Sequence, residues 1–467
     1  MSTARTDRLT VTKAYNGQVL DELALEDWDT VDRHLKTAEQ LHRSGATLPV
    51  YRRIEILEAL ASGMESEVDA YATLIAQEGG KPLTDARVEV LRAINGVRLA
   101  IGEIENSGGV EIPMDLSAAG DGRTAFTRKY PIGPVVAVSA FNHPLNLIVH
   151  QAVPAIATGC PVIVKPADTT PLSCLRFVEA VYRAGLPEEW CRAVLTDIPT
   201  AERLVTDPRV AFFTFIGSAR VGWHLRSKLA PGTRCALEHG GAAPVIVHDD
   251  ADLERIVPMI VKGGYYHAGQ VCVSVQRIFA ANPIKDRLVE MLTAQVGALK
   301  VGDPELAETE VGPLILPREV DRVASWVDEA VTAGAGKAIG GEKLSDHVYR
   351  PTILVDPPAD AKVSTLEIFG PVTCVYGFDD LDDAVARANA LPVAFQAAVF
   401  TQNIDRALKT ADRLDASAVM INDHSAFRVD WMPFAGLRQS GLGVGGIPYT
   451  MEDMVIDKMT VIRRQSA

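Results

Sequence analysis

The chain has 467 residues, 47% of them hydrophobic, so it can fill a large core and is expected to divide into roughly two or three domains. Its formal net charge of −14 comes from 60 acidic and 46 basic residues spread along the whole sequence. Because no basic block would follow a nucleic-acid backbone, we expect no nucleic-acid partner.

The N-terminus and the apolar runs indicate a cytoplasmic protein without a membrane partner. Met1–Arg5 leads into polar residues rather than into the apolar stretch of a secretory signal. No later apolar run approaches the roughly 20 residues that span a bilayer. The cysteines contain no CxxC pair, so we expect free thiols and no metal. They are Cys160, Cys174, Cys191, Cys235, Cys272 and Cys374.

Two helices are expected first along the chain. Val50–Glu78 places apolar residues at spacings of three and four, which predicts one amphipathic helix that ends at Gly79-Gly80. A second helix is expected to begin at Thr84, whose hydroxyl can cap free N–H groups. Its apolar face is expected to contain Val88, Leu91, Ile94 and Leu99.

From Pro134 onward, short β-branched runs alternate with helical patterns, which indicates an α/β fold with parallel sheets and helices on their faces. The pattern restarts near residue 241, so two sheet domains with a cleft between them are expected. The runs are Val135–Val138, Leu147–Ala157, Val162–Val164, Leu172–Ala184, Ala211–Phe215, Val245–Val247, Leu253–Tyr265 and Ile278–Ala280.

Two segments, Gly109–Lys129 and Val455–Arg463, are poor in helix signals and predict extended chain. Neither buries much surface alone, so we expect them to pair with each other and with another subunit. This pattern predicts a homodimer or a homotetramer.

The run Gly441–Gly446 fits the dinucleotide pattern GxGxxG formally. However, no predicted strand precedes it and no βαβ unit follows it, so we do not interpret it as a dinucleotide site.

A cysteine and a glutamate stand out as chemical candidates. Cys272 ends the segment Gly269–Cys272, on a loop between a predicted helix and a predicted strand, where nucleophiles tend to lie. A loop cysteine taken alone is more often a small buried apolar residue. Glu238 ends another predicted strand beside Gly240-Gly241, and paired glycines let the backbone approach a neighbour closely.

Seven motifs, in this order and spread from about residue 10 to about residue 465, resemble the aldehyde dehydrogenase superfamily. The resemblance implies an enzyme that oxidises an aldehyde to a carboxylic acid with NAD(P) and hydrolyses a thioester. The motifs are Phe141–Pro144, Val164–Asp168, Phe215–Ser218, Glu238–Gly241, Gly269–Cys272, Glu367–Pro371 and Pro433–Gly436.

The resemblance implies a role for each of three catalytic residues. The Cys272 thiolate adds to the aldehyde carbon and forms a thiohemiacetal, then a thioester. The Asn142 amide and the Cys272 backbone N–H stabilise the oxyanion. Glu238 takes the proton from the water that hydrolyses the thioester.

The cofactor residues are implied in the same way. Lys165 and Asp168 would bind the adenine ribose, and Gly217-Ser218 would bind phosphate at a helix N-terminus. Glu367 would hold the nicotinamide ribose, with Phe369 and Phe141 beside it. NAD is the expected cofactor and NADP the alternative, since Asp168 stands where NAD-preferring members usually carry glutamate. Without the resemblance, Lys165 would be read as a solvated charge and Phe369 as a core residue.

The family's architecture implies a Rossmann-like cofactor domain, an α/β catalytic domain and a small β oligomerisation arm. We expect residues 1–108 and 132–240 to form the cofactor domain and residues 241–448 the catalytic domain. Residues 109–131 and 449–467 would form the arm.

The substrate is indicated by the run Ile421–Pro433, which resembles the branch acting on short polar aldehydes such as lactaldehyde and phosphono- or sulfo-substituted aldehydes. Arg92 and Arg428 would bind a substrate anion, because guanidinium suits carboxylate, phosphonate or sulfonate. A purely structural arginine is the alternative for each. The candidate substrate residues are Arg92, His143, Phe427, Arg428 and Trp431.

Three other functions stay open. A semialdehyde dehydrogenase of amino-acid or sugar catabolism would use the same chemistry with another pocket. An acylating enzyme would pass the thioester to coenzyme A, but such members generally lack the glutamate that Glu238 supplies. A non-catalytic structural protein on this fold would not need Cys272, Glu238 and Asn142.

Overall fold

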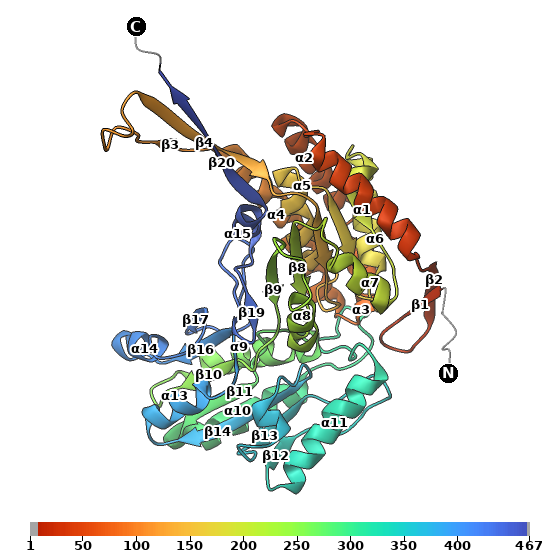
Figure 1. The fold of residues 1–467 in the computed structure, drawn as a ribbon. Coiled ribbons are helices and arrows are strands. Elements are labelled where there is room, and N and C mark those ends of the chain that lie inside the picture. Colours follow the sequence, from red (N-terminus) through yellow and green to blue (C-terminus); the bar gives the residue numbers. More distant parts are fainter. Residues whose placement is uncertain (1–7, 465–467) are drawn as a thin grey trace.

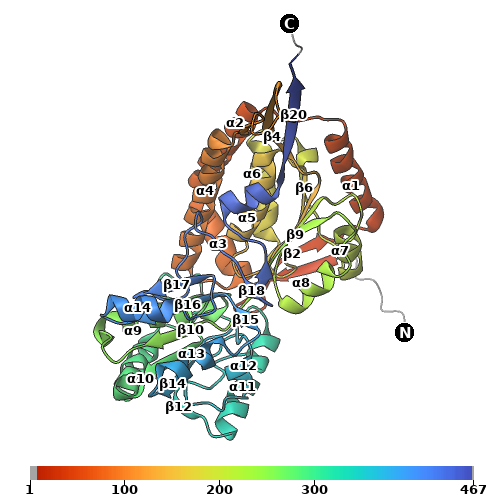
Figure 2. The ribbon, with the colours of Figure 1, turned by 60° about the vertical axis from the view of Figure 1, so that its left-hand side comes forward.

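The computed structural model describes residues 8–464 and contains two α/β units with a β arm that projects from the first unit (Figure 1). Figure 2 shows the two units one above the other. None of the helices in residues 8–464 combines the length and the apolar character needed to cross a membrane.

The N-terminal region differs from the predicted single helix over Val50–Glu78. Two helices form there, α2 (Val50–Ser66) and α3 (Val68–Gly79). The helix is interrupted at Glu67, whose φ of −119° and ψ of 18° are not helical. The predicted end at Gly79-Gly80 is confirmed, because Gly80 takes the left-handed φ of 71° that favours glycine. Before these helices lie β1 (Arg8–Thr12), β2 (Val19–Ala24) and α1 (Trp28–Arg43).

Helix α4 (Leu83–Asn106) starts one residue before the predicted Thr84, directly after Pro82. The predicted apolar face is wrong for Val88 and Leu91, which are each 55% exposed, and correct for Ile94, which is buried. The face that packs against α2, α3 and α5 carries mostly small residues, which let the helices approach closely. Its members include Ala86, Val90, Ala93, Ile94, Val97 and Ala100.

The first sheet has the strand order β19-β9-β8-β5-β6-β7, and all its pairs are parallel except that of β19 with β9. The chain leaves β5 toward β6 on one side and returns to β8 on the other, so the carboxyl ends of β5 and β8 flank a crevice where ligands bind in such sheets. The strands are β5 (Val135–Val138), β6 (Val162–Lys165), β7 (Cys191–Ala193), β8 (Phe212–Ile216), β9 (Arg234–Glu238) and β19 (Gly441–Leu442).

The helices of this unit cover the predicted positions closely. The predicted runs at 147–157 and 172–184 are helices within one residue at each end. The helices of this unit are α5 (Asn146–Thr158), α6 (Leu172–Arg183), the 3-10 helix η1 (Glu188–Trp190), α7 (Ile198–Val205) and α8 (Ala219–Arg226).

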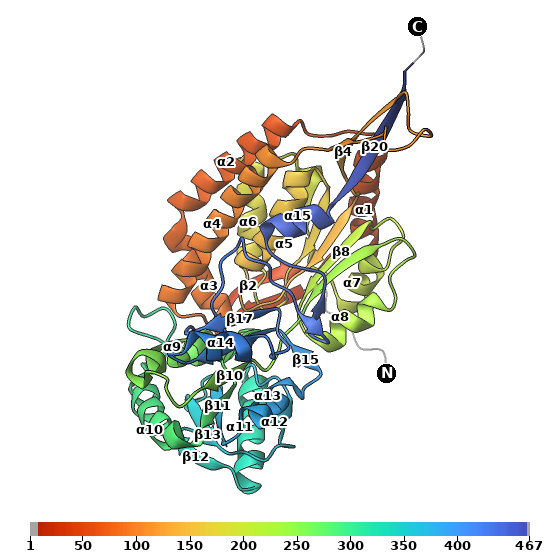
Figure 3. The same ribbon diagram turned by 90° about the vertical axis from the view of Figure 1, so that its left-hand side faces the viewer.

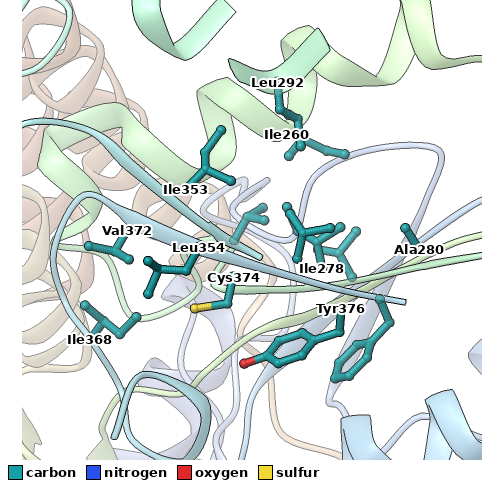
Figure 4. Packing of buried hydrophobic residues seen from close by; sticks show 14 of the residues in the cluster. Ile260, Ile278, Ala280, Leu292, Ile353, Leu354, Ile368, Val372, Cys374 and Tyr376 are labelled. Carbon is teal, nitrogen blue, oxygen red and sulfur yellow. The ribbon is translucent and has the colours of Figure 1, made fainter. Parts of the chain in front are cut away.

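The second sheet has the order β12-β13-β14-β11-β10-β16-β17 and is parallel except for β12 with β13. Its core packs aliphatic side chains around Cys374 and Tyr376 (Figure 4). The strands are β10 (Pro244–Val247), β11 (Arg277–Ala281), β12 (Gly336–Ile339), β13 (Thr352–Val355), β14 (Val372–Phe378), β16 (Gln396–Phe400) and β17 (Ala418–Ile421).

Several helices surround this second sheet, and the predicted helix Leu253–Tyr265 is confirmed at both ends. They are α9 (Leu253–Tyr265), the 3-10 helix η2 (Tyr266–Gly269), α10 (Asn282–Ala298), α11 (Pro317–Thr332), α12 (Lys362–Thr365), α13 (Leu381–Asn389) and α14 (Ile404–Ala411).

The arm confirms the predicted pairing of its two extended segments. Strand β20 (Val455–Arg463) pairs antiparallel with β4 (Arg123–Pro131) along its whole length, and β3 (Glu111–Ile112) pairs with β4. Figure 3 shows the arm extending away from both units. Because little other chain covers it, the apolar side chains of Met459, Val461 and Ile462 are about half exposed.

The C-terminal part of the chain returns from the second unit to the first. Strand β18 (Leu437–Arg438) pairs with β15 (Val393–Ala394), and the next strand, β19, joins the first sheet. Helix α15 (Ile447–Asp453) then packs on α4 and α5. The functional division of the chain into cofactor and catalytic domains stays a prediction.

Candidate active site

A cleft of about 990 Å³ lies between the two units, at the carboxyl ends of β5, β8 and β9. This is the crevice that the strand order of the first sheet indicates. Its wall includes most of the predicted site residues, namely Arg92, Phe141, Asn142, His143, Asp168, Gly217, Ser218, Glu238, Cys272, Glu367, Phe369 and Arg428.

The loop that carries Cys272 is shaped by unusual backbone angles. His267 and Ala268 have φ values of 49° and 53°, and Gly269 has a φ of 70°. A Cβ on Gly269 would overlap the carbonyl of Gly370, so only glycine fits there. The loop is therefore held in one tight conformation against the second sheet.

The side chain of Gln270 fixes the same loop from the other side. Its Oε1 accepts a hydrogen bond from Ile315 N at 2.9 Å, and its Nε2 donates to Pro313 O at 3.2 Å. The Gln270 carbonyl accepts from Asn142 Nδ2 at 2.9 Å. Asn142 follows β5 in the first unit, so this bond joins the two units directly beside Cys272.

Glu238 lies at the carboxyl end of β9, where it pairs with Gly441 of β19. The glycine-rich run Gly441–Gly446 packs behind it, and a Cβ on Gly445 would lie 3.0 Å from Glu238 Oε2. The run therefore gives the carboxylate room beside closely packed backbone, and it remains a prediction that it binds no dinucleotide.

Burial controls the protonation of both groups. It raises the pKa of Glu238, and the nearby Arg428 guanidinium opposes that shift. Burial also raises the pKa of the Cys272 thiol, and the Glu238 carboxylate raises it further. In the cofactor-free protein the thiol is therefore protonated at neutral pH.

Arg428 is a buried cation in the wall of the cleft. Its Nη1 lies 3.7 Å from Glu238 Oε1, and its guanidinium lies 3.6 Å from the centre of the Phe434 ring. Its Nε is buried without a hydrogen-bond partner within residues 8–464. Much of the hydrogen-bonding capacity of this cation is thus unused.

Arg92 also faces the cleft, but its charge is already paired. Its Nη2 and Nε donate to the two Asp430 oxygens at 2.7 Å and 3.2 Å. Asp430 is buried and also lies 2.8 Å from His150 Nε2 and 3.3 Å from Asn146 Nδ2. Sequence patterns gave no signal for this network, because its members are far apart in the chain.

Phe427 and Trp431 were predicted to contact the substrate, but the structure does not bring them into the cleft. Their side chains are 41% and 54% exposed. In this irregular segment Ala426 and Arg428 face the cleft and Asp430 points into the protein. The positions that remain for Phe427 and Trp431 are therefore on the outside of the subunit.

At one end of the cleft, Lys165 and Asp168 form an ion pair with 2.6 Å between Nζ and Oδ1. Asp168 is half-exposed and lines the cleft, whereas Lys165 is buried. Gly217 and Ser218 lead into α8, and the Ser218 side chain makes no capping hydrogen bond there. The first N–H groups of α8 are thus available to an anion.

Farther along the cleft, Glu367 Oε1 accepts a hydrogen bond from Gly241 N at 3.2 Å. A Cβ on Gly240 would overlap this carboxylate, so the glycine makes space for it. Burial raises the pKa of Glu367 to about 8. Phe369 has a φ of 48°, and its ring meets the Phe141 ring edge-to-face at 5.8 Å.

His143 contacts a buried ion pair that the sequence patterns did not reveal. Lys81 and Glu89 pair with each other, and each has a side-chain exposure of 1%. Lys81 Nζ lies 2.8 Å from His143 Nδ1. All six cysteines are free, and within residues 8–464 no three His, Cys, Asp or Glu side chains converge to hold a metal.

Comparison with known proteins shows which family the chain belongs to. Residues 1–460 match the aldehyde dehydrogenase family, and the chain belongs to that family. It is 35% identical over 457 residues to 3-sulfolactaldehyde dehydrogenase from Priestia aryabhattai, covering 98% of this chain and 95% of that protein.

Two solved structures are similar over nearly the whole chain. Aldehyde dehydrogenase 21 from Physcomitrella patens, in complex with the reaction product succinate, superposes with a TM-score of 0.95 at 33% identity, covering 99% of this chain and 96% of that one. Glyceraldehyde-3-phosphate dehydrogenase from Methanocaldococcus jannaschii, complexed with NADP, gives 0.93 at 32% identity, covering 98% and 100%. The protein is an NAD(P)-dependent aldehyde dehydrogenase that oxidises an aldehyde to its acid.

The electrostatics of the cleft generate a first prediction. Glu238→Gln removes a negative charge beside Cys272, so the pKa of the thiol should fall. Alkylation of Cys272 by iodoacetamide in the cofactor-free enzyme, followed by peptide mass spectrometry between pH 7 and 10, should be roughly three- to tenfold faster in this variant.

Cys235, the other partly exposed cysteine, provides an internal control. Glu238 is not among the groups that shift its pKa, so its alkylation rate should stay unchanged. A slower reaction of Cys272 in Glu238→Gln would mean instead that Glu238 removes the thiol proton.

Proposed function

We propose that this enzyme oxidises a small aldehyde carrying an acidic group, through a thioester on Cys272 that water hydrolyses. The observation that carries the proposal is the position of Arg428, a buried guanidinium that lines the same cleft as Cys272 and Asn142. A partly unpaired buried cation favours a bound anion, because burial without a partner is costly. The similar proteins named for 3-sulfolactaldehyde and bound to succinate handle compounds of this kind.

The first step is addition of Cys272 Sγ to the aldehyde carbon. The thiol releases its proton to solvent, the S–C bond forms, and the carbonyl π electrons move onto oxygen. Asn142 Nδ2–H and the Cys272 N–H would donate to this oxyanion. In the ligand-free cleft Asn142 Nδ2 donates to the Gln270 carbonyl, so the same amide is already held beside the loop of Cys272.

The second step is collapse of the thiohemiacetal. The oxyanion re-forms the C=O bond, and the hydrogen on that carbon leaves as hydride, so that a thioester remains on Cys272. NAD(P), when bound, supplies the nicotinamide ring that accepts the hydride. Glu367 and Phe369 would hold the nicotinamide end of the cofactor.

The third step is hydrolysis. Glu238 takes one proton from water while the water oxygen attacks the thioester carbonyl. The C–S bond then breaks, the acid leaves, and the proton is returned to the Cys272 thiolate. The raised pKa of Glu238 makes it a better base than an exposed carboxylate.

The residues present fit the cofactor. The open N-terminus of α8 at Gly217-Ser218 suits the pyrophosphate, and a Cβ on Gly217 would lie 2.7 Å from the Phe215 ring. The Lys165–Asp168 pair suits the adenine ribose hydroxyls. In this reading residues 1–108 and 132–240 bind the cofactor, and residues 241–448 supply Cys272 and Arg428.

We predict a preference for NAD over NADP. The Asp168 carboxylate can accept hydrogen bonds from the ribose hydroxyls, whereas it would repel a 2′-phosphate. The ratio of kcat/KM for the two cofactors measures this preference, and Asp168→Asn should shift it toward NADP. Equal efficiency of the native enzyme with both cofactors would contradict the prediction.

The two halves of the reaction can be separated in Glu238→Gln. Addition and hydride transfer precede the entry of water, so a rapid burst of about one reduced nicotinamide per active site should remain. Steady turnover should fall roughly 10²- to 10⁴-fold, the usual contribution of a general base. Stopped-flow absorbance measures both phases, and mass spectrometry should find the acyl group on Cys272.

Cys272→Ala is the matched control, because it should bind the cofactor but give neither burst nor turnover. An unchanged steady rate in Glu238→Gln would remove Glu238 as the base for hydrolysis.

The role of Arg428 can be tested with succinic semialdehyde and propanal. Arg428→Met should lower kcat/KM for succinic semialdehyde roughly 10- to 100-fold, the value of hydrogen bonds to a charged group. Propanal, which has no anion, should change little, and Arg428→Lys should keep part of the preference. The parameter kcat/KM is chosen because it reports the steps before hydrolysis. Propanal is the reference for any effect that the lost charge has on Cys272 itself.

Propanal oxidised as efficiently as succinic semialdehyde by the native enzyme would defeat the proposed anion specificity. Succinic semialdehyde also tests the alternative semialdehyde function. Comparing its kcat/KM with that of sulfolactaldehyde shows whether a carboxylate or a sulfonate is preferred.

We further propose that the arm makes a homodimer or a homotetramer. The half-exposed Met459, Val461 and Ile462 on β20 form an apolar surface that a second subunit would cover. Multi-angle light scattering at micromolar concentration should give a mass of two or four chains, and a single-chain mass would argue against this.

A further inference from the structure

Lys81 and Glu89 form a buried ion pair beneath the segment that carries Asn142 and His143. Lys81 lies between α3 and α4, and Glu89 lies on α4. Glu89 Oε1 accepts hydrogen bonds from Leu145 N at 2.9 Å and from Asn146 N at 3.1 Å. The pair therefore holds the start of α5 in place, although none of the proposed catalytic steps uses it.

The contact with Lys81 determines the protonation state of His143. Lys81 Nζ lies 2.8 Å from His143 Nδ1. An ammonium group has only donors, so Nδ1 must be the acceptor and the proton of the neutral ring must lie on Nε2. Burial, together with the Lys81 charge, lowers the pKa of His143 to about 4, so the ring stays neutral near pH 7.

The ion pair keeps its charge because its partners compensate for burial. Burial alone would raise the pKa of Glu89, but the Lys81 ammonium overcomes this effect and holds it low. Glu89 thus remains a carboxylate. Glu89 Oε2 lies 3.6 Å from His143 Nδ1, farther than Lys81 Nζ. Burial lowers the pKa of Lys81, and the Glu89 carboxylate opposes that shift. Lys81 Nζ contacts both Glu89 and His143 Nδ1, as a donor to two acceptors.

The edge of the His143 imidazole that does not contact Lys81 faces the cleft. His143 lines the cleft beside Asn142, and its side chain keeps 14% of its exposure. Within residues 8–464 Nε2 has no hydrogen-bond partner, and the atom is not fully buried. The Nδ1 edge is turned to Lys81, so the accessible edge is the one that carries the Nε2 proton.

We propose that His143 is a specificity-determining residue whose Nε2–H donates a hydrogen bond to a hydroxyl on the carbon next to the aldehyde, with Lys81 fixing the tautomer. The substrate class is then a 2-hydroxyaldehyde. A neutral donor suits a neutral oxygen, whereas the cationic Arg428 suits an anionic one. His143 lines the same cleft as Asn142 and Cys272, so its donor is accessible to an aldehyde bound there. This inference rests on the proposed function, because it assumes that the aldehyde reacts at Cys272.

The test uses lactaldehyde and propanal, which differ by that hydroxyl alone. The native enzyme should favour lactaldehyde in kcat/KM. His143→Phe keeps a ring of similar size but has no donor, so the lactaldehyde-to-propanal ratio should fall about tenfold, the value of one neutral hydrogen bond. His143→Gln places an amide N–H near the former Nε2 and should recover much of the ratio.

Propanal reports any purely structural effect, because it needs Asn142 and Cys272 but no hydroxyl donor. If His143→Phe lowers both substrates equally, His143 only positions Asn142 and the proposal is wrong. A native ratio near one, or an unchanged ratio in His143→Phe, would also overturn it. Such results would leave the anion preference measured with succinic semialdehyde untouched, so the two proposals fail separately.

Lys81→Met tests the origin of the tautomer. Without the ammonium donor, Nδ1 can carry the proton, so the lactaldehyde preference should fall as in His143→Phe while propanal is still oxidised. This variant leaves the Glu89 carboxylate buried and unpaired, which can prevent folding. Glu89→Gln combined with Lys81→Met removes that charge, and a retained preference in this folded double variant would refute the role of Lys81.

Discussion

Burial of a nucleophile beside a carboxylate is the constraint on which the rest of the cleft depends. Burial raises the pKa of both Cys272 and Glu238, and the Glu238 carboxylate raises that of Cys272 further. The arrangement favours the uncharged thiol in the ligand-free cleft. It also explains why a cation, Arg428, lies close to Glu238, since an uncompensated carboxylate there would be costly.

The neighbouring polar residues are arranged so that each buried charge has a partner. Asp430 accepts from Arg92 and His150 and anchors the segment that carries Arg428. Lys81 and Glu89 do the same for the segment that carries Asn142 and His143. The two networks both reach α5, through Asn146, so the oxyanion side and the substrate side of the cleft rest on one helix.

Local patterns predicted the elements well where the periodicity was strong, as in Val135–Val138 and Leu253–Tyr265. They failed at α4, because small residues such as Ala93 form its buried face and hydropathy favours larger ones. In the site, the motif residues could be named from sequence. Asp430 and Lys81 could not, because their partners are set by tertiary packing alone. The side-chain directions of Phe427 and Trp431 in an irregular loop were unpredictable for the same reason.

The return of the chain from the second unit to the first has a consequence for biosynthesis. Glu238 gains its neighbours at Gly441 and Gly445 only after the whole second unit has been made. Domains generally fold from the N-terminus during translation, so the first sheet can form early with its edge strand β9 still unpaired. The last segment then closes that edge, so the backbone around Glu238 is complete only once β19 and Gly445 have been made.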